Sequence, residues 1–366
     1  MKATHTKPDR FLFGLILILT TGGFAIFSSA ALGQASRIGA SFSVVALKQF
    51  SILFFGLIMM IITTNIPYKH WRKYSPYLFA LSLFLTCLVF LPNFGHSAGG
   101  AKSWLKLGFA TFQPSEFLKF SFIAFLAAWL AARKEKIKDL KEGFLPFLFF
   151  LSLIGLILLA QPDTGTFMII ALAAIGLFVV AGGRWSHLLI IFLLGAILLG
   201  ALVTFKPYIR ERLITYINPS HDSLGSSWQI KQSLITIGSG GVIGRGFGQG
   251  IQKFNFLPQP IGDSIFAVAS EEFGFVGSST IIILFLILAL WGLKITNKVK
   301  DNFGRLLGIG FILLITVQSF INIGAIIGIF PLTGVPLAFI SHGGTALLFA
   351  LIQAGIILNI SKEIGK

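Results

Sequence analysis

The chain has 366 residues, of which 55% are apolar and only 11% are charged, and its mean hydropathy is +0.87. These values exclude a soluble globular protein and indicate an integral membrane protein. The formal net charge is +16. In a membrane protein such a basic excess indicates loops that face anionic membrane lipids, and we expect no nucleic-acid partner.

Apolar runs alternate with short charged loops along the whole sequence, which favours one polytopic bundle. We therefore predict an all-α polytopic membrane protein and treat residues 1–366 as a single transmembrane domain. About ten runs approach the length needed to cross roughly 30 Å of hydrocarbon. The predicted helices span about residues 11–33, 44–65, 76–92, 115–132, 143–160, 167–183, 186–206, 264–293, 305–330 and 336–360.

The basic residues are distributed unevenly between the two sides that this topology defines. If the N-terminus is cytoplasmic, the cytoplasmic segments carry most of the lysines and arginines. The short outer loops carry only Arg37, Lys48, Lys102 and Lys106. This asymmetry predicts that both termini are cytoplasmic, which an even number of helices allows.

Two outer segments differ from ordinary short loops. The first, at about 93–114, contains GHSAGGAKSWLKLGFATFQPSE, in which Trp104 offers a rigid aromatic face. The second is a large extracytoplasmic loop at 207–263, between the seventh and eighth helices, and loops of this length are usually functional. Within it we expect amphipathic elements near 208–217 and 226–238.

A glycine-rich turn follows these elements at 238–250, with the sequence GSGGVIGRGFGQG inside it. No strand precedes it and no Lys-Ser/Thr pair closes it. The sequence therefore gives no support for a nucleotide site.

Asp263 is the carboxylate best placed for chemistry. It follows the polar loop and precedes a long apolar segment, so we expect it at the boundary between water and membrane. Partial desolvation there raises the pKa of a carboxylate and suits it to act as a general base. The alternative is that Asp263 only caps the helix that follows, since Asp is a preferred N-cap residue.

Other ionisable residues lie at the outer ends of predicted helices. Glu116 and Lys119 are three residues apart, so they share a helix face and can form a salt bridge that fixes packing; alternatively, Lys119 meets an anionic ligand. Asp163 lies in the turn QPDTGT, where turn chemistry alone explains it. Arg210 and Arg212 can grip a diphosphate through their forked guanidinium groups or simply form a solvated face.

Glu271 and Glu272 lie about two turns into the eighth predicted helix. Ionisable groups at such positions usually face the bundle interior. We expect at least one of the two to find a polar partner there.

Five stretches in order along the chain resemble the SEDS family, membrane proteins of the RodA and FtsW type that polymerise peptidoglycan glycan strands. The resemblance covers nearly the whole chain, and the glycine-rich stretch is more similar to the FtsW branch. The stretches are GAKSWLKLGFATFQPSEFLK, QPDTGT, RERLITYINPSHDSLGSSWQIKQSLITIGSGGVIGRGFGQG, FLPQPIGDSIFAVASEEFGFVG and QSFINIGAIIGIFPLTGVPLAFISHGGTALL.

The resemblance implies an inverting glycosyltransferase of the bacterial cytoplasmic membrane that polymerises lipid II, a disaccharide-pentapeptide carried on undecaprenyl diphosphate, for cell division or elongation. It implies Asp263 as catalytic base and a class B penicillin-binding protein as partner. Positive charge for the departing diphosphate would come from basic residues or a bound divalent cation, Mg²⁺ or Mn²⁺, and no organic cofactor is expected. The implied substrate-contacting residues are Trp104, Gln113, Glu116, Lys119, Asp163, Arg210, Arg212 and Ser341.

The chain departs from the family pattern at two places. It has Ile261-Gly262 where the family commonly has His-Thr before the catalytic Asp, and Ser341-His342-Gly343-Gly344-Thr345 where the family commonly has Ser-Tyr-Gly-Gly-Ser. We expect His342 to be a packing histidine, since no second His or acid lies at ligand spacing.

Two other functions compete with polymerisation. A lipid II flippase or other carrier would also contain intramembrane charges and glycine-broken helices, but it would place its key charges near the midplane. A noncatalytic scaffold for the penicillin-binding protein would use Asp263 only as a helix cap. The clustering of distinctive residues toward the outer face favours the polymerase.

Overall fold

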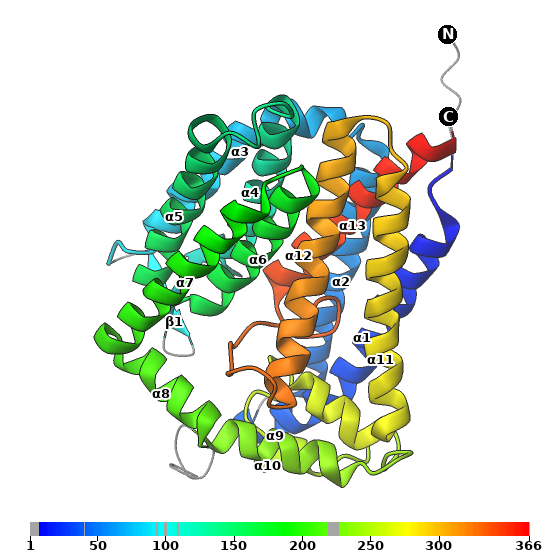
Figure 1. The fold of residues 1–366 in the computed structure, drawn as a ribbon. Coiled ribbons are helices and arrows are strands. Elements are labelled where there is room, and N and C mark those ends of the chain that lie inside the picture. Colours follow the sequence, from blue (N-terminus) through cyan, green and yellow to red (C-terminus); the bar gives the residue numbers. More distant parts are fainter. Residues whose placement is uncertain are drawn as a thin grey trace.

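The computed structural model describes residues 7–39, 41–92, 94–98, 101–107, 110–218 and 227–365. The described chain is a helical bundle with one small sheet (Figure 1). The terminal residues 1–6 and 366 of the predicted domain, and residues 219–226 of the predicted 207–263 loop, lie outside the described ranges.

Ten long helices match the ten predicted segments in order. They are α1 (Arg10–Ile38), α2 (Phe42–Asn65), α3 (Lys69–Leu88), α4 (Pro114–Ala132), α5 (Leu145–Ala160), α6 (Thr164–Val180), α7 (Trp185–Phe205), α11 (Ile265–Asn297), α12 (Asn302–Ile326) and α13 (Gly344–Ser361). A π-helical turn, Leu140–Phe144, leads into α5, and a 3₁₀ turn, Lys362–Gly365, follows α13. Eight of the described helical segments are long and apolar enough to cross a membrane, and α6 is a shorter apolar helix. The protein is therefore a multi-pass membrane protein.

The two ends of the bundle differ in structure. At one end the start of α1 meets the end of α13, where the backbone amide of Asp9 donates to Ser361 Oγ at 2.9 Å. The opposite end carries three short helices, α8 (Pro207–Ile217), α9 (Trp228–Ser239) and α10 (Gln252–Asn255), which lie across the ends of the long helices (Figure 1). The two predicted amphipathic elements thus correspond to α8 and α9.

The first outer loop contains a three-stranded antiparallel sheet that we did not predict. Its strands are β1 (Gly95–Ala98), β2 (Ala101–Leu107) and β3 (Ala110–Phe112), in that order. Along β2, Ser103 and Leu105 are buried whereas Lys106 is exposed. This alternation is typical of a strand with one covered face.

The centre of the bundle is formed by α4, α12 and α13, which are buried along most of their length. Close packing there depends on small residues: a side chain at Gly355 of α13 would overlap Thr63 Oγ1 of α2. In contrast, α7 lies at the edge of the bundle, and His187 is its only buried residue among those described.

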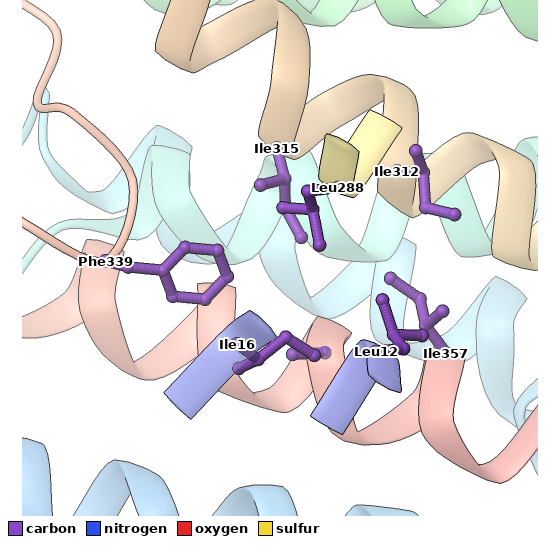
Figure 2. Close-up of a pocket in the computed structure, with 8 residues that line it drawn as sticks. Leu12, Ile16, Leu288, Ile312, Ile315, Phe339 and Ile357 are labelled. Atoms are coloured by element: carbon purple, nitrogen blue, oxygen red, sulfur yellow. The ribbon is translucent and has the colours of Figure 1, made fainter. Parts of the chain in front are cut away.

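The bundle interior contains an apolar pocket between α1, α11, α12 and α13 (Figure 2). Only apolar side chains line it, and they are Leu12, Ile16, Leu288, Ile312, Ile315, Phe339, Ala354 and Ile357. It offers no polar group for binding or catalysis, so the candidate site lies elsewhere.

The eighth predicted helix, 264–293, corresponds to α11, which is interrupted at one residue. α11 breaks at Gly274, which has φ 65° and ψ −162°. The amides of Phe275 and Val276 donate to the main-chain oxygens of Gly241 and Val242, at 2.9 and 3.1 Å. Backbone groups freed by the break are thus satisfied by the glycine-rich turn rather than left unpaired.

The last predicted helix also starts later than expected. Residues 336–343 were assigned to it, but α13 begins at Gly344. Pro331 and Pro336, together with Gly334 at φ 69°, prevent a regular helix over 331–343. We call residues 331–343 the bracing loop.

The break in α11 should not tolerate a side chain, because it packs against the glycine-rich turn. Gly274 has a left-handed φ, and a Cβ there would overlap the backbone of Gly244 and Val242. We expect Gly274→Ala to lower the melting temperature of the purified protein in detergent, measured by fluorescence-detected size exclusion after heating. Gly238→Ala is the matched control, because a Cβ at Gly238 of α9 meets nothing within 4 Å and Ala favours a helix. Equal melting temperatures for the two variants would contradict this role of Gly274.

Candidate functional site

Asp263 lies at the end of the bundle that carries α8–α10, two residues before the start of α11. Its side chain is partly exposed. The N-cap position of α11 is Ser264, and no side chain there accepts a capping hydrogen bond. The structure therefore does not show Asp263 in the capping role that was its alternative.

The two carboxylate oxygens of Asp263 have different surroundings. Oδ2 accepts a hydrogen bond from Gln229 Nε2 at 2.9 Å, and the same amide nitrogen lies 3.2 Å from Ser264 Oγ. Oδ1 is buried and has no hydrogen-bond partner among the described residues. One oxygen is thus held by the protein, and the other has unused acceptor capacity.

Burial raises the pKa of Asp263 above its ordinary value. The hydrogen bond from Gln229, the nearby amides of Asp263 and Ser264 and the positive charge of Arg212 partly oppose this rise. The result is a carboxylate with a raised pKa in a partly open position. That combination is typical of a general base.

The backbone at Asp263 is fixed by Asn322 of α12. Asn322 Nδ2 donates to the main-chain oxygens of Asp263, at 2.9 Å, and of Val335, at 2.8 Å. One amide group therefore ties the segment before α11 to the bracing loop. Asn322 lies in the stretch QSFINIG, which carries part of the family resemblance, but it was not among the predicted site residues.

The bracing loop makes further contacts with the residues that precede Asp263. Ser341 Oγ donates to the main-chain oxygen of Gly262 at 2.7 Å, and the amide of His342 donates to that of Ile261 at the same distance. Ser341 is buried. The structure thus places Ser341 in support of the Asp263 segment, and its predicted contact with substrate stays a prediction.

His342 points away from this segment toward α1 and α2. Its Nδ1 lies 2.9 Å from Gln49 Oε1, and its ring stacks on Phe27. Burial lowers the pKa of His342, so the neutral form with a proton on Nδ1 suits the amide oxygen of Gln49. The expectation of a packing histidine agrees with this geometry.

Glu116 and Lys119 form the salt bridge that their spacing allows. The N–O distance is 2.8 Å, and both side chains are almost completely buried. Lys119 Nζ also donates to Gln318 Oε1 of α12 at 2.6 Å, and Gln318 Nε2 donates to the main-chain oxygen of Pro336 at 2.8 Å. The pair therefore connects α4 to the bracing loop, and a contact between Lys119 and an anionic ligand stays a prediction.

Arg212 lies where α8 approaches the start of α6. Its Nη1 is 3.5 Å from Thr164 Oγ1, and its guanidinium lies 5.9 Å from the centre of the Tyr208 ring. Asp163 caps α6 through Oδ1, which accepts from the Thr166 amide at 3.2 Å. The positive charge of Arg212 also lowers the pKa of Asp263. Arg212 therefore lies close enough to Asp263 to act on it electrostatically.

Three predicted substrate residues are not joined to Asp263 by any contact within the described ranges. Trp104 is half-buried on β2, and Gln113 is half-buried just before α4. Arg210 is exposed on α8. The described contacts do not link these three residues to Asp263, and their predicted contacts with substrate stay predictions.

The glycine-rich turn is anchored by a second buried ion pair. Lys253 Nζ lies 2.6 Å from Glu272 Oε1, and both side chains are fully buried. Lys253 also donates to Ser29 Oγ of α1, and the amide of Ile251 donates to Glu271 Oε1. Glu271 and Glu272 thus both have polar partners, as expected. Their contacts hold the glycine-rich turn against the bundle.

The region around Asp263 offers oxygen atoms suited to a hard divalent cation. The buried oxygens without a hydrogen-bond partner in the described part of the chain include Asp263 Oδ1, Asp163 Oδ2 and Asn322 Oδ1. Carboxylate and amide oxygens are the ligands that Mg²⁺ and Mn²⁺ prefer. No cluster of three or more His, Cys, Asp or Glu residues suited to a metal occurs among the described residues, so any such site would also draw ligands from the substrate.

Comparison with known proteins gives a consistent result over the full length of the chain. The model of the FtsW, RodA and SpoVE family, which is described as "Cell cycle protein", matches residues 9–365. Stage V sporulation protein E of Bacillus subtilis is 38% identical over 99% of both chains. A probable peptidoglycan glycosyltransferase FtsW of Geobacter sulfurreducens is 38% identical over 86% of this chain and 84% of its own length.

Two solved structures share the fold. One, described as a peptidoglycan synthase complex that coordinates polymerisation and crosslinking, matches with a TM-score of 0.81 and 27% identity over 98% of both chains. The rod shape determining protein RodA of Thermus thermophilus matches with a TM-score of 0.71 and 25% identity, again over 98% of both chains.

The Glu116–Lys119 pair should be essential for stability. Lys119→Met leaves Glu116 buried without a charge partner, and we expect it to destabilise the protein by about 3–5 kcal/mol. Unfolding by sodium dodecyl sulfate, followed by tryptophan fluorescence, measures this. Lys136→Met is the matched control, since it breaks an ion pair with Glu142 in which both side chains are more than half exposed, and we expect a change within about 1 kcal/mol. Similar losses for both variants would contradict the assigned role of the buried pair.

Proposed function

The chain belongs to the FtsW, RodA and SpoVE family, and we propose that it is a peptidoglycan glycosyltransferase that polymerises lipid II at the outer face of the cytoplasmic membrane. The product would be glycan strands for cell division or elongation. The observation that carries the proposal is the carboxylate of Asp263, which has a raised pKa, one held oxygen and one free oxygen at the outer end of the bundle.

The reaction needs a base because a sugar hydroxyl is a weak nucleophile. The 4-hydroxyl of an acceptor GlcNAc attacks the anomeric carbon of a donor MurNAc, and the bond from that carbon to the lipid diphosphate breaks with inversion. The hydroxyl proton passes to Asp263 Oδ1, and the bonding electrons leave with the diphosphate. Asp263 is thus proposed as the catalytic residue.

The departing diphosphate gains negative charge and needs positive charge nearby. Arg212 is the best placed side chain, because it lies beside Thr164 and its charge reaches Asp263. Exposed Arg210 on the same helix can join it when substrate is bound. Lys119 would have to leave Glu116 and Gln318 to take this role.

A divalent cation is proposed as the cofactor, and no organic cofactor is proposed. Asp163 Oδ2 and Asn322 Oδ1 would hold it together with substrate phosphate, which leaves Asp263 Oδ1 to accept the proton. When bound, such a cation would neutralise charge on the leaving diphosphate.

The proposal also assigns substrate contacts to two residues near the start of α4. Trp104 and Gln113 lie along the β2–α4 region beside Glu116. This region would face the sugar or peptide part of lipid II, while the lipid tail stays in the bilayer. An open groove would suit a lipid-linked substrate better than a closed pocket would.

The membrane orientation and the partner are also part of the proposal. We propose that both termini are cytoplasmic and α8–α10 lie outside, which the distribution of lysines and arginines favours. The start of α1 and the end of α13 lie at one end of the bundle, opposite α8–α10, which supports this arrangement (Figure 1). The similarity to a peptidoglycan synthase complex that coordinates polymerisation with crosslinking supports a class B penicillin-binding protein as partner.

Replacing Asp263 tests the proposed base. Wild type and Asp263→Asn, each with its cognate penicillin-binding protein, are assayed for polymerisation of labelled lipid II with divalent cation present. The partner must be active only in transpeptidation. We expect polymer from the wild type and at least a hundredfold lower rate from the variant, since general-base catalysis contributes about 10²–10⁴-fold.

The control is the folding of the variant, because Asn keeps the size of the side chain and can still meet Gln229. Its melting temperature should be close to that of the wild type. Equal polymerisation by both proteins would remove Asp263 from the chemistry. If the wild type makes no polymer under conditions in which a related enzyme is active, the result would favour a carrier or a scaffold.

Removal of divalent cations tests the proposed cofactor. We expect a chelator to abolish polymerisation by the wild type and Mg²⁺ or Mn²⁺ to restore it, because charge on the diphosphate is then neutralised. The melting temperature should not change on chelation, since no described structural contact depends on a metal. Full activity after chelation would contradict the proposal.

A further inference from the structure

We propose that the glycine-rich turn is immersed in the membrane, at the boundary between the acyl chains and the headgroups of the leaflet next to α8–α10. In the proposed orientation this is the outer leaflet. The inference goes beyond the proposed function, because it concerns a surface that the glycosyltransferase chemistry does not use. It also changes the interpretation of the 207–263 segment, part of which lies in lipid rather than in water.

The turn and the break in α11 expose a group of large apolar side chains. We call this group the outer apolar patch, and its members, each at least 55% exposed, are Val242, Ile243, Phe247, Phe275 and Val276. The backbone brings them together, since the amides of Phe275 and Val276 donate to the main-chain oxygens of Gly241 and Val242. The ring centres of Phe247 and Phe273 are 6.2 Å apart. Large apolar side chains that gather in this way on a surface mark an interaction site.

The outer apolar patch continues directly into the membrane-facing side of α11. Val276, Ile283 and Leu290 are spaced seven residues apart, so they share one face of the helix. All three are more than half exposed, and α11 is long and apolar enough to cross a membrane. Lipid therefore covers this face, and the same lipid reaches the patch at the end of the face.

The length of α11 gives the depth of the patch. At the other end of the helix, Lys294 lies 4.8 Å from the centre of the Trp291 ring, and such residues are typical of a membrane interface. Between Lys294 and the break, Phe275–Leu293 contains 19 residues and no charge. At about 1.5 Å per residue this segment rises about 28 Å, close to the roughly 30 Å of hydrocarbon. Phe275 therefore lies at the boundary of the hydrocarbon, and the turn to which it is hydrogen-bonded lies at the same depth.

A turn can enter this boundary at low cost only when the protein itself satisfies its backbone polar groups. The amides of Arg245 and Gly246 donate to the main-chain oxygens of Glu271 and Glu272, both at 3.0 Å. The amide of Gly248 donates to the carboxylate of Glu272 at 3.1 Å. The two glutamates thus supply the acceptors that water supplies to an ordinary loop.

The charged side chain of the turn also fits this depth. Arg245 is 38% exposed, and its Nε donates to the main-chain oxygen of Ser239 at 3.3 Å and lies 3.6 Å from Glu271 Oε1. The exposed part of its guanidinium can bind a lipid phosphate, since Arg binds phosphate through a fork. Long basic side chains reach the headgroups from apolar surroundings in the same way. The patch and Arg245 together therefore match a leaflet that contains anionic phospholipid.

Fluorescent labelling at single cysteines tests this inference. Cys87 is the only cysteine of the chain, so Cys87→Ser gives a background for Ile243→Cys or Phe247→Cys. Each variant is labelled in detergent with an environment-sensitive fluorophore and reconstituted into vesicles of phosphatidylglycerol and phosphatidylcholine. Quenching is measured with a lipid that carries a nitroxide at the top of its acyl chains and, separately, with aqueous iodide. At both positions we expect emission at short wavelength, quenching by the nitroxide lipid and protection from iodide.

Two further variants in the same background define the signals of lipid and of water. Ile283→Cys places the label on the membrane-facing side of α11. Glu211→Cys places it on the exposed face of α8, at the same end of the bundle as the turn, so it also controls for the orientation of the protein in the vesicles. All substituted side chains are at least half exposed or charged and on the surface, and each variant should keep a melting temperature close to that of the wild type.

The results separate lipid from the other possible occupants. Labels at 243 and 247 that behave like the label at 283 support the inference. Labels that iodide quenches as strongly as the label at 211 would overturn it, because the turn would then lie in water. The measurement is repeated with the cognate penicillin-binding protein in the same vesicles. Lipid quenching that persists supports lipid as the occupant, whereas lipid quenching that the partner abolishes would make the patch a protein docking surface and overturn the inference. None of these results depends on polymerisation, so a failure here leaves the proposed glycosyltransferase in place.

Discussion

The amide of Asn322 is the contact on which the outer end of the molecule depends. It binds the main-chain oxygens of Asp263 and Val335 together, and each belongs to a segment without regular structure. Such segments cannot satisfy their own backbone groups, and near a membrane they cannot rely on water. Side chains from the central helix α12 supply the missing donors. The position of the proposed base is thus set by the core of the bundle.

The few acidic residues of the chain differ in the partners that surround them. Glu116 and Glu272 are buried with lysine partners and hold structure together, while Asp263 forms no ion pair with the described residues and has one oxygen without a partner among them. A paired carboxylate is stabilised in its charged form and is a poor base, whereas a desolvated one held by neutral donors is better suited to accept a proton. The difference between structural and candidate catalytic acids lies in their partners.

The length of the apolar runs was sufficient to predict the ten long helices, and eight of the described helical segments are long and apolar enough to cross a bilayer. The Glu116–Lys119 pair was predictable from local spacing. The break at Gly274 and the bracing loop were not, since both depend on backbone contacts between segments far apart in sequence. Gln229, Gln318 and Asn322 were missed for the same reason: a single amide in an apolar helix gives no signal until its partner's position is known.

The break in α11 has a mechanical consequence. The part of α11 that follows Gly274 extends along the bundle as a membrane span, whereas the part before it lies against α9 and the glycine-rich turn (Figure 1). A spanning helix tilts when bilayer thickness varies, and a continuous α11 would transmit that tilt to its first residues as a rigid lever. The break at Gly274 interrupts that lever, and the residues on both sides of it are hydrogen-bonded to the glycine-rich turn. The turn therefore braces α11 at the point where the tilt would be passed on toward Asp263.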